Sequence, residues 1–475
     1  MISLLDGATI VALGASEPGK PIMSILSVNK LALELVARDF SDGHAPNNAG
    51  PTKTARALAI IHMAARDAYA KVTGVYAPKL AGLPAPPTGL LTDDATGAAA
   101  VLGAGIRAAT LLYPDFAQFI NDQSVMITAT ADPEAMFYGC EIAEKWIASR
   151  QNDGAGHPQT DSMYGNMPGH HRPDPVSRGA ALGRTWGQTA PFILNDVATD
   201  APLGPPPGLT TADYAKAFDE VFVFGRDNIV TRSPAFRQKA LIGVFWGYDG
   251  SNKLGTPPRL YNQVVIETTE FKALPHSDQV NVLAAINAAM ADAGIAAWYW
   301  KYVYDFWRPV VAIREAEAGF GPTGLGDNNA IRIQQGDPFW LPFGAPRSNP
   351  IPPIAAGAAG DNFTPNFPAY PSGHATFGTA CFETFAKLVG KTPATITVKF
   401  VSGEFAGVTN NPFNPGTTDH TGALRPRWEQ TFTLKTAIEQ NAESRIWLGV
   451  HWRFDATGGE TVGQAVALKA IAAFT

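Results

Sequence analysis

The 475-residue chain is predicted to be mainly α-helical, with long loops that are rich in proline and glycine. Three observations support this fold class. Apolar residues recur at helical spacing in several long segments, the 38 prolines gather outside those segments, and strand signals are few. A hydrophobic fraction of 45% with 16% charged residues is typical of a globular chain with a large buried core.

The spacing of apolar residues predicts the following helices, given in chain order. The amphipathic or buried segments predicted to be helices are residues 53–72, 95–112, 134–148, 211–222 and 236–245. A long helix is predicted after Pro275, with Ser277 as its N-cap, and Pro309 is expected to stop it. Two more helices are predicted at 429–448, ending at Gly449, and from Asp455 to residue 473. Residues 395–401 are the best strand candidate, and residues 154–174, 201–209 and 319–367 are expected to be loops.

Length and charge restrict the class of protein. A chain of this length is expected to contain about three domains. We divide it into an N-terminal helical region, 1–200, and a C-terminal helical region, 201–475, that carries the candidate site. The net charge of −6 gives no reason to expect a nucleic acid or an anionic membrane as partner. We find no run of about 18 uninterrupted apolar residues, so no membrane span is expected.

The cellular compartment and the assembly state stay open at this point. The N-terminus lacks the basic region of a secretory signal, and we read it as mature chain. A secreted or periplasmic location remains open. Cys140 and Cys381 are too few and too far apart for a disulfide framework or a thiolate metal site. The composition is compatible with a homo-oligomer without requiring one.

The first chemical motif is KYVYDFWRP at 301–309. Lys301 and Arg308 are seven residues apart, which on a continuous helix places two side chains on nearly the same face. Trp298 lies on the same stripe, and Asp305 lies between the two cations. The alternative interpretation is a solvated charged face with an ion pair to Asp305.

The second motif is PSGH at 371–374, before an apolar run with helical spacing. Ser372 is placed as N-cap of that helix, whose first amides and positive dipole end suit an anion. Gly373 lacks a Cβ, so an oxygen can approach its N–H closely. The alternative is a plain helix cap followed by an exposed His374.

The third motif is SRIWLGVHWRFD at 444–455. A turn after Gly449 can fold His451 back beside Arg445. Asp455 can accept the proton of one imidazole nitrogen and so fix the tautomer, which leaves the other nitrogen of His451 free for an electrophilic centre. The alternative is a structural Arg–Asp pair with a buried histidine.

Taken together, the motifs indicate one oxyanion site. Lys301, Arg308 and Arg445 supply three cations, and the two arginines have the fork geometry that suits oxygens. These charges, with the hydroxyl and amide donors, suit a four-oxygen anion of charge about −2 to −3.

The three segments resemble the signature shared by type 2 phosphatidic acid phosphatases and vanadium-dependent haloperoxidases. That signature has the form KxxxxxxRP, PSGH and SRxxxGxHxxxD. Its fixed positions are met by Lys301, Arg308, Pro309, Pro371, Ser372, Gly373, His374, Ser444, Arg445, Gly449, His451 and Asp455. The resemblance implies a mainly α fold with two four-helix-bundle cores, of the vanadium haloperoxidase kind.

The resemblance also implies a cofactor and residue roles. The vanadate-binding positions would be Lys301, Arg308, Ser372, Gly373, Arg445 and His451. His451 would be the ligand of the metal, and His374 and Lys301 would be the catalytic residues.

Four residues would support this site. Trp298 and Phe367 resemble the aromatic wall of the chloride-oxidising branch, whereas the bromide-oxidising algal branch carries histidine at the position of Phe367. Asp249 looks similar to the carboxylate that orients the arginines in the family, and Asp455 is expected to orient His451.

The function predicted on this basis is vanadium-dependent haloperoxidase activity. Hydrogen peroxide would oxidise chloride or bromide to hypohalous acid, which halogenates small organic acceptors. One alternative is a soluble acid phosphatase that uses the same residues and forms a phosphohistidine at His451. The other is an oxyanion-binding or storage protein, for which two histidines would be needless.

Overall fold

The computed structural model describes ten stretches of the chain. They are residues 24–40, 44–157, 165–175, 178–226, 234–250, 253–321, 324, 336–344, 364–406 and 427–475. The N-terminal segment that we read as mature chain lies outside these residues, as does most of the proline-rich loop predicted at 319–367. The fold in the described residues is mainly α-helical, as predicted.

Five helices form the N-terminal part of the described chain. They are α1 (Ser24–Asp39), α2 (Gly50–Thr73), α3 (Asp94–Leu112), α4 (Ala117–Ile127) and α5 (Pro133–Ser149). The predictions for α2, α3 and α5 are confirmed, since each boundary lies within a few residues of the expected one. Helices α1 and α4 were not predicted from the spacing of apolar residues.

The middle of the chain contains several short helices and one long helix. These elements are α6 (Val197–Asp200), α7 (Ala212–Phe224), α8 (Pro234–Phe245), α9 (Pro257–Glu267), α10 (Thr269–Lys272), α11 (His276–Tyr304) and α12 (Pro309–Glu315). The C-terminal elements are α13 (Gly373–Leu388), β1 (Thr397–Val401), β2 (Glu429–Thr433), α14 (Leu434–Trp447) and α15 (Arg453–Phe474).

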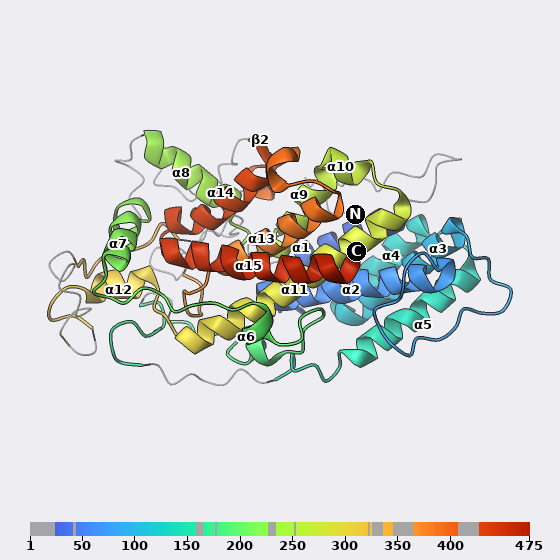
Figure 1. Ribbon diagram of the computed structural model, residues 1–475, viewed down its shortest axis with the longest axis horizontal. Coiled ribbons are helices and arrows are strands. Elements are labelled where there is room, and N and C mark those ends of the chain that lie inside the picture. The colour runs from blue at the N-terminus through green and yellow to red at the C-terminus, as the bar shows by residue number, and fades with distance from the viewer. Residues whose placement is uncertain are drawn as a thin grey trace, which may run out of the picture.

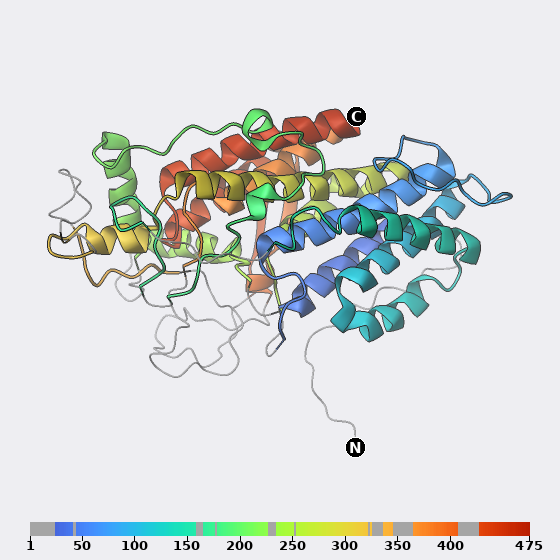
Figure 2. The same ribbon diagram turned by 90° about the horizontal axis from the view of Figure 1, so that it is seen from below.

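Helix α11 connects the two ends of the molecule (Figure 1). It packs against α2 on the N-terminal side and against α13 and α15 on the C-terminal side. Seen from below, it runs lengthwise past the blue N-terminal helices and the red C-terminal ones (Figure 2). This packing therefore fixes the position of α11 relative to α15. The division of the chain near residue 200 stays a prediction.

The end of α11 differs from the prediction. The helix stops at Tyr304, and Asp305 adopts a left-handed conformation with φ 48°. Arg308 is the N-cap of α12, and Pro309 occupies its first turn, where a missing N–H costs nothing. Lys301 and Arg308 therefore do not share one helix, and the seven-residue spacing argument is wrong. The start also differs, because Pro275, not Ser277, occupies the N-cap position.

Residues 429–433 also differ from the prediction, which placed them in a helix. They form β2, which pairs antiparallel with β1 in the register Thr397↔Thr433 to Val401↔Glu429. The alternation of EQTFT, with Phe432 buried between more exposed neighbours, is typical of a strand. Thr433 then caps α14, because its Oγ1 accepts the amide of Thr436 at 3.1 Å.

Two helices among the described residues, α3 and α11, are long and apolar enough to cross a membrane. Most of each apolar window is buried inside the protein, 67% for α3 and 94% for α11. Core packing accounts for this composition, because both helices are surrounded by other helices of the fold.

Helices α3 and α5 approach each other closely at two glycines. A Cβ on Gly103 would collide with the main chain of Met136, and a Cβ on Gly139 would collide with the main chain of Ala100. Backbone cannot move aside as a flexible side chain can. The crossing therefore requires glycine on both helices.

We predict that Gly139→Ala lowers the stability of the N-terminal helices. Forcing a methyl group into a packed contact typically costs about 1–3 kcal/mol. Gly156→Ala is the matched control, because nothing lies within 4 Å of its added Cβ. Urea unfolding followed by circular dichroism would measure both variants. Equal midpoints for the two variants would contradict the close crossing.

Candidate active site

The three motifs meet at buried ends of α11, α13, α14 and α15. Arg308 Nη1 lies 3.0 Å from His451 Nε2, which joins the first motif to the third. The amide of Ser372 donates to the main-chain oxygen of Asp455 at 2.8 Å, which joins the second to the third. Lys301 Nζ reaches the oxygen of Pro371 at 2.5 Å, which joins the first to the second. The predicted residues are thus brought together.

The tautomer of His451 follows from its two partners. The Arg308 guanidinium can only donate, so the Nε2 atom of His451 carries the lone pair. The proton therefore sits on Nδ1, which donates to Asp455 Oδ2 at 2.8 Å. Burial, then the charges of Arg308 and Lys301, hold the pKa of His451 well below its usual value. His451 presents a basic nitrogen toward the arginine side of the site.

Asp455 has two functions in the local structure. Its Oδ2 also accepts the amide of Trp452 at 2.9 Å, which caps the start of α15 and fixes the carboxylate. The carboxyl group is fully buried, and burial raises the pKa of Asp455 to about 7, opposed by that amide and by the charges of Lys301 and Arg308. The expected Asp455–His451 contact is present.

Arg445 is held by Asp249. Its Nη1 and Nη2 donate to the two carboxylate oxygens at 2.7 and 2.8 Å, a bidentate pair that fixes the plane of the guanidinium. Burial raises the pKa of Asp249, and Arg445 counteracts that rise. Asp249 therefore contacts an arginine of the site, although it lies in the loop after α8, far away in sequence.

His374 lies in the first turn of α13 and is buried, not exposed as the alternative interpretation held. Its Nε2 donates to the oxygen of Gly247 at 2.8 Å and lies 3.7 Å from Asp249 Oδ1. Nδ1 is then the nitrogen that can accept a proton. Burial and the nearby charge of Arg445 hold the pKa of His374 well below its usual value.

Three buried donors of the site have no hydrogen-bond acceptor among the residues that the structure describes. They are Arg308 Nη2, Arg445 Nε and Ser372 Oγ. Ser372 is the N-cap of α13, as predicted, yet its hydroxyl does not cap the helix. The amide of Gly373 belongs to the first turn, where a helix offers no internal acceptor. Buried donors without acceptors are costly, so this arrangement is suited to an anion.

Lys301 is fully buried and engaged with the main chain. Its Nζ donates to the oxygens of Pro368, Ala369 and Pro371 at 2.8, 3.0 and 2.5 Å. Burial, followed by the charge of Arg308, holds the pKa of Lys301 well below its usual value. The ammonium fastens the segment before α13, and it brings its charge beside the site.

Two aromatic rings form a wall beside the cations. The rings of Trp298 and Phe367 lie 4.7 Å apart between centroids. The Nζ of Lys301 lies 5.2 Å and the Cζ of Arg308 lies 5.0 Å from the centroid of Phe367. At Gly373 an added Cβ would come within 3.2 Å of the Trp298 ring. The glycine thus leaves room for the indole as well as for a ligand.

Asp305 does not pair with the site cations. Its carboxylate lies 3.2 Å from His170 Nδ1, and its main-chain oxygen accepts the amide of His171. The alternative of an Asp305 ion pair within the first motif is therefore wrong. The left-handed end of α11 turns this side chain toward residues 170–171.

Two residues that were not predicted from the sequence hold the start of α13. Asn441 Nδ2 and the Tyr261 hydroxyl both donate to the main-chain oxygen of His374, at 2.7 and 3.2 Å, and Tyr261 also donates to Asn441 Oδ1. An added Cβ on Gly378 would press on Asn441. The one available signal was that Asn441 lies one helical turn before Arg445.

A third histidine also lies near the site. His171 is buried, and its pKa is lowered to about 3 by burial and by the charges of Arg308, Lys301 and Arg172. His171 was not predicted as a site residue, since the pair at 170–171 belongs to no recognised motif.

Comparison with known proteins supports a single family. A family model for the second helical-bundle domain of VCPO matches residues 281–475. A vanadium chloroperoxidase of Curvularia inaequalis is 29% identical over 512 residues, which cover 87% of this chain and 76% of that protein. In sequence, the chain is similar to the vanadium haloperoxidases. The matched domain includes all three motifs.

Two solved structures of vanadium haloperoxidases share the fold of this chain. A bacterial vanadium-dependent iodoperoxidase has a TM-score of 0.69 and 19% identity, with 96% of this chain and 98% of that chain covered. A holo-type bacterial vanadium-dependent chloroperoxidase has a TM-score of 0.62 and 17% identity, with 91% and 94% covered. At these identities the likeness concerns the fold.

The residues present fit a vanadate ion. Among the described residues no group of three or more His, Cys, Asp or Glu side chains could hold a metal ion, so a many-ligand metal centre is not available there. Instead, three donors of the three motifs are buried without an acceptor, and the lone pair of His451 Nε2 faces the Arg308 guanidinium. Oxygens of a tetrahedral anion match the donors, and an electrophilic central atom matches His451 Nε2.

We predict that Asp249→Ala weakens the binding of orthovanadate by about 10–100-fold, the usual effect of losing an orienting partner. Arg445 would lose both of its anchoring bonds. Asp305→Asn is the matched control, because Asp305 pairs with His170 and asparagine tolerates its positive φ. Isothermal titration with orthovanadate would measure both variants. An unchanged affinity in Asp249→Ala would remove this carboxylate from the site.

Proposed function

We propose that the chain is a vanadium-dependent haloperoxidase that oxidises chloride and bromide with hydrogen peroxide and passes the halogen to small organic acceptors. The observation that carries the proposal is the set of buried donors without acceptors beside the His451 lone pair. The similar proteins support it, since they include chloroperoxidases and an iodoperoxidase.

The vanadate oxygens would be held by the guanidinium groups of Arg308 and Arg445, by the Ser372 hydroxyl and by the Gly373 amide. His451 Nε2 would be the ligand of the metal. Bound vanadium supplies Lewis acidity that activates hydrogen peroxide without a change of its own oxidation state. The positive charges would offset the charge of the oxygens, and Asp249 and Asp455 keep Arg445 and His451 oriented.

The overall reaction consumes one proton. Hydrogen peroxide, a halide ion and a proton give hypohalous acid and water, with two electrons moving from halide to peroxide oxygen. His374 is the group that we assign to move the proton. Its Nε2 is engaged with Gly247, and its low pKa keeps Nδ1 unprotonated and able to act as a base.

Lys301 would act through its charge. Its ammonium lies within the same buried cluster and lowers the pKa of both His374 and His451. Direct hydrogen bonding to a peroxide oxygen would require one of its three N–H groups to leave a main-chain oxygen. Trp298 and Phe367 keep this side of the site apolar, and a dry site strengthens the effect of the charge.

One assay separates the proposal from its phosphatase alternative. Purified protein with orthovanadate and peroxide should brominate and chlorinate monochlorodimedone, while orthovanadate should inhibit a phosphatase that hydrolyses p-nitrophenyl phosphate. Parallel assays with iodide, bromide and chloride rank the halides. Vanadate activation with chloride turnover supports the proposal. Oxidation of iodide alone would contradict the halide assignment, and vanadate inhibition of phosphate hydrolysis without halogenation would contradict the reaction.

We predict that Lys301→Met lowers the rate of halide oxidation by about 100-fold or more, the usual effect of losing one transition-state donor or charge. Vanadate should still bind, because the donors of Arg308, Arg445 and Ser372 remain. Lys469→Met, which removes an exposed ion pair with Asp200, is the control. Steady-state kinetics and vanadium content would be measured together. Full turnover in Lys301→Met would exclude the lysine from the mechanism.

A further inference from the structure

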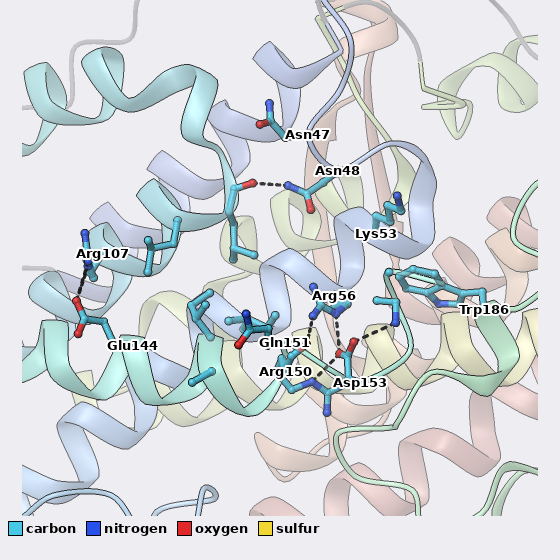
Figure 3. Close-up of a pocket in the computed structure, with 17 residues that line it drawn as sticks. Asn47, Asn48, Lys53, Arg56, Arg107, Glu144, Arg150, Gln151, Asp153 and Trp186 are labelled. Carbon is cyan, nitrogen blue, oxygen red and sulfur yellow. Dashed lines mark hydrogen bonds and ion pairs between the residues drawn. The ribbon is translucent and has the colours of Figure 1, made fainter. Parts of the chain in front are cut away.

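A second pocket lies among the N-terminal helices, away from the oxyanion site. It has a volume of about 580 Å³ and opens between α2, α3 and α5 (Figure 3). Its wall is completed by residues 153–156 and by Trp186 of the short 3-10 helix Trp186–Gln188. None of the residues of the three motifs lines it. The vanadate chemistry therefore leaves this pocket without an assigned role.

The pocket is built from one face of each helix. Lys53, Arg56 and Ile60 recur at three- and four-residue spacing on α2, and Glu144, Ile147 and Ala148 do so on α5. These faces are neighbours in the helical cluster. The lining contains polar side chains together with aliphatic side chains from all three helices. The wall is thus both charged and apolar.

The charged wall carries excess positive charge. Four basic side chains line the pocket against two carboxylates. Arg107 pairs with Glu144 at 2.7 Å, and Arg56 and Arg150 share one carboxylate, that of Asp153, at 2.7 and 2.9 Å. Figure 3 shows these pairs as separate groups. They leave Lys53 without a carboxylate partner in the described part of the chain.

A buried donor on the same wall has no acceptor. Trp186 is only 3% exposed, and its indole Nε1 has no hydrogen-bond partner among the residues that the structure describes. A buried N–H of this kind normally finds an acceptor. Lys53 and Trp186 both line the pocket, so a ligand with acceptor oxygens would satisfy both.

We propose that this pocket binds a small aromatic carboxylate. The carboxylate would pair with the Lys53 ammonium and accept the Trp186 N–H, and the ring would pack against Ile60, Leu111 and Ile147. An inorganic anion would leave the apolar wall uncovered, whereas a neutral aromatic compound would leave the lysine unpaired. The volume suits a ligand of one or two fused rings.

The test is isothermal titration of the full-length protein with 2-naphthoate. Orthovanadate is present in excess, so that the oxyanion site is occupied. We expect saturable binding of one molecule per chain, and at least tenfold weaker binding of the neutral 2-naphthalenemethanol. Lys53→Gln should weaken 2-naphthoate binding about tenfold, and Trp186→Phe, which keeps an aromatic ring but removes the indole N–H, about fivefold.

Lys216→Gln on α7 is the matched control, since this lysine is exposed and remote from the pocket. Its affinity for 2-naphthoate should equal that of the unmodified protein. Thermal unfolding of Lys53→Gln should be unchanged, which separates lost binding from lost folding. The proposal is overturned if 2-naphthoate shows no saturable binding or if the neutral alcohol binds equally well. It is also overturned if neither Lys53→Gln nor Trp186→Phe weakens the binding of 2-naphthoate.

Discussion

The burial of three cations in one cluster is the constraint on which the site depends. Lys301, Arg308 and Arg445 are all at most 1% exposed, and an unpaired charge in such surroundings is expensive. Among the described residues, Asp249 and Asp455 are the carboxylates that act on these cations. The cluster therefore has a positive excess that an anion would neutralise. The protein can maintain these charges because its folding free energy is supplied by the large helical core.

The helical frame turns this charge cluster into a preorganised site. Helix α11 packs against α2, α13 and α15, which fixes the ends from which Lys301 and the first turn of α13 emerge. Main-chain groups do much of the positioning. The oxygens of Phe367 and Val450 accept from Arg308 at 2.9 and 2.7 Å. A substitution elsewhere in these loops would then alter the site through the backbone.

Much of the fold could be predicted because helical periodicity is local information. The boundaries of α2 and α3 follow from the spacing of their apolar residues, and the start of α13 at Ser372 follows from capping chemistry. β2 was assigned to a helix because a five-residue strand beside a long helix has too short a pattern to stand out. The end of α11 was misplaced because Asp305 tolerates a left-handed conformation that ends a helix before any proline.

That the three motifs lie together could be predicted from the sequence, but the geometry of their contacts could not. The motifs identified Arg308, His451 and Ser372, but the argument from helical spacing gave the wrong reason for bringing Lys301 and Arg308 together. The contacts of Tyr261 and Asn441 with the oxygen of His374 depend on tertiary packing and leave no local pattern. The engagement of Lys301 with three main-chain oxygens was likewise invisible in sequence.

The most direct measurement is a vanadium anomalous difference map from crystals of the protein grown with orthovanadate. The account predicts one strong peak bonded to His451 Nε2, with oxygens directed at Arg308 Nη2, Arg445 Nε and Ser372 Oγ. A peak at any other imidazole, or a fully loaded crystal with no peak beside His451, would contradict it.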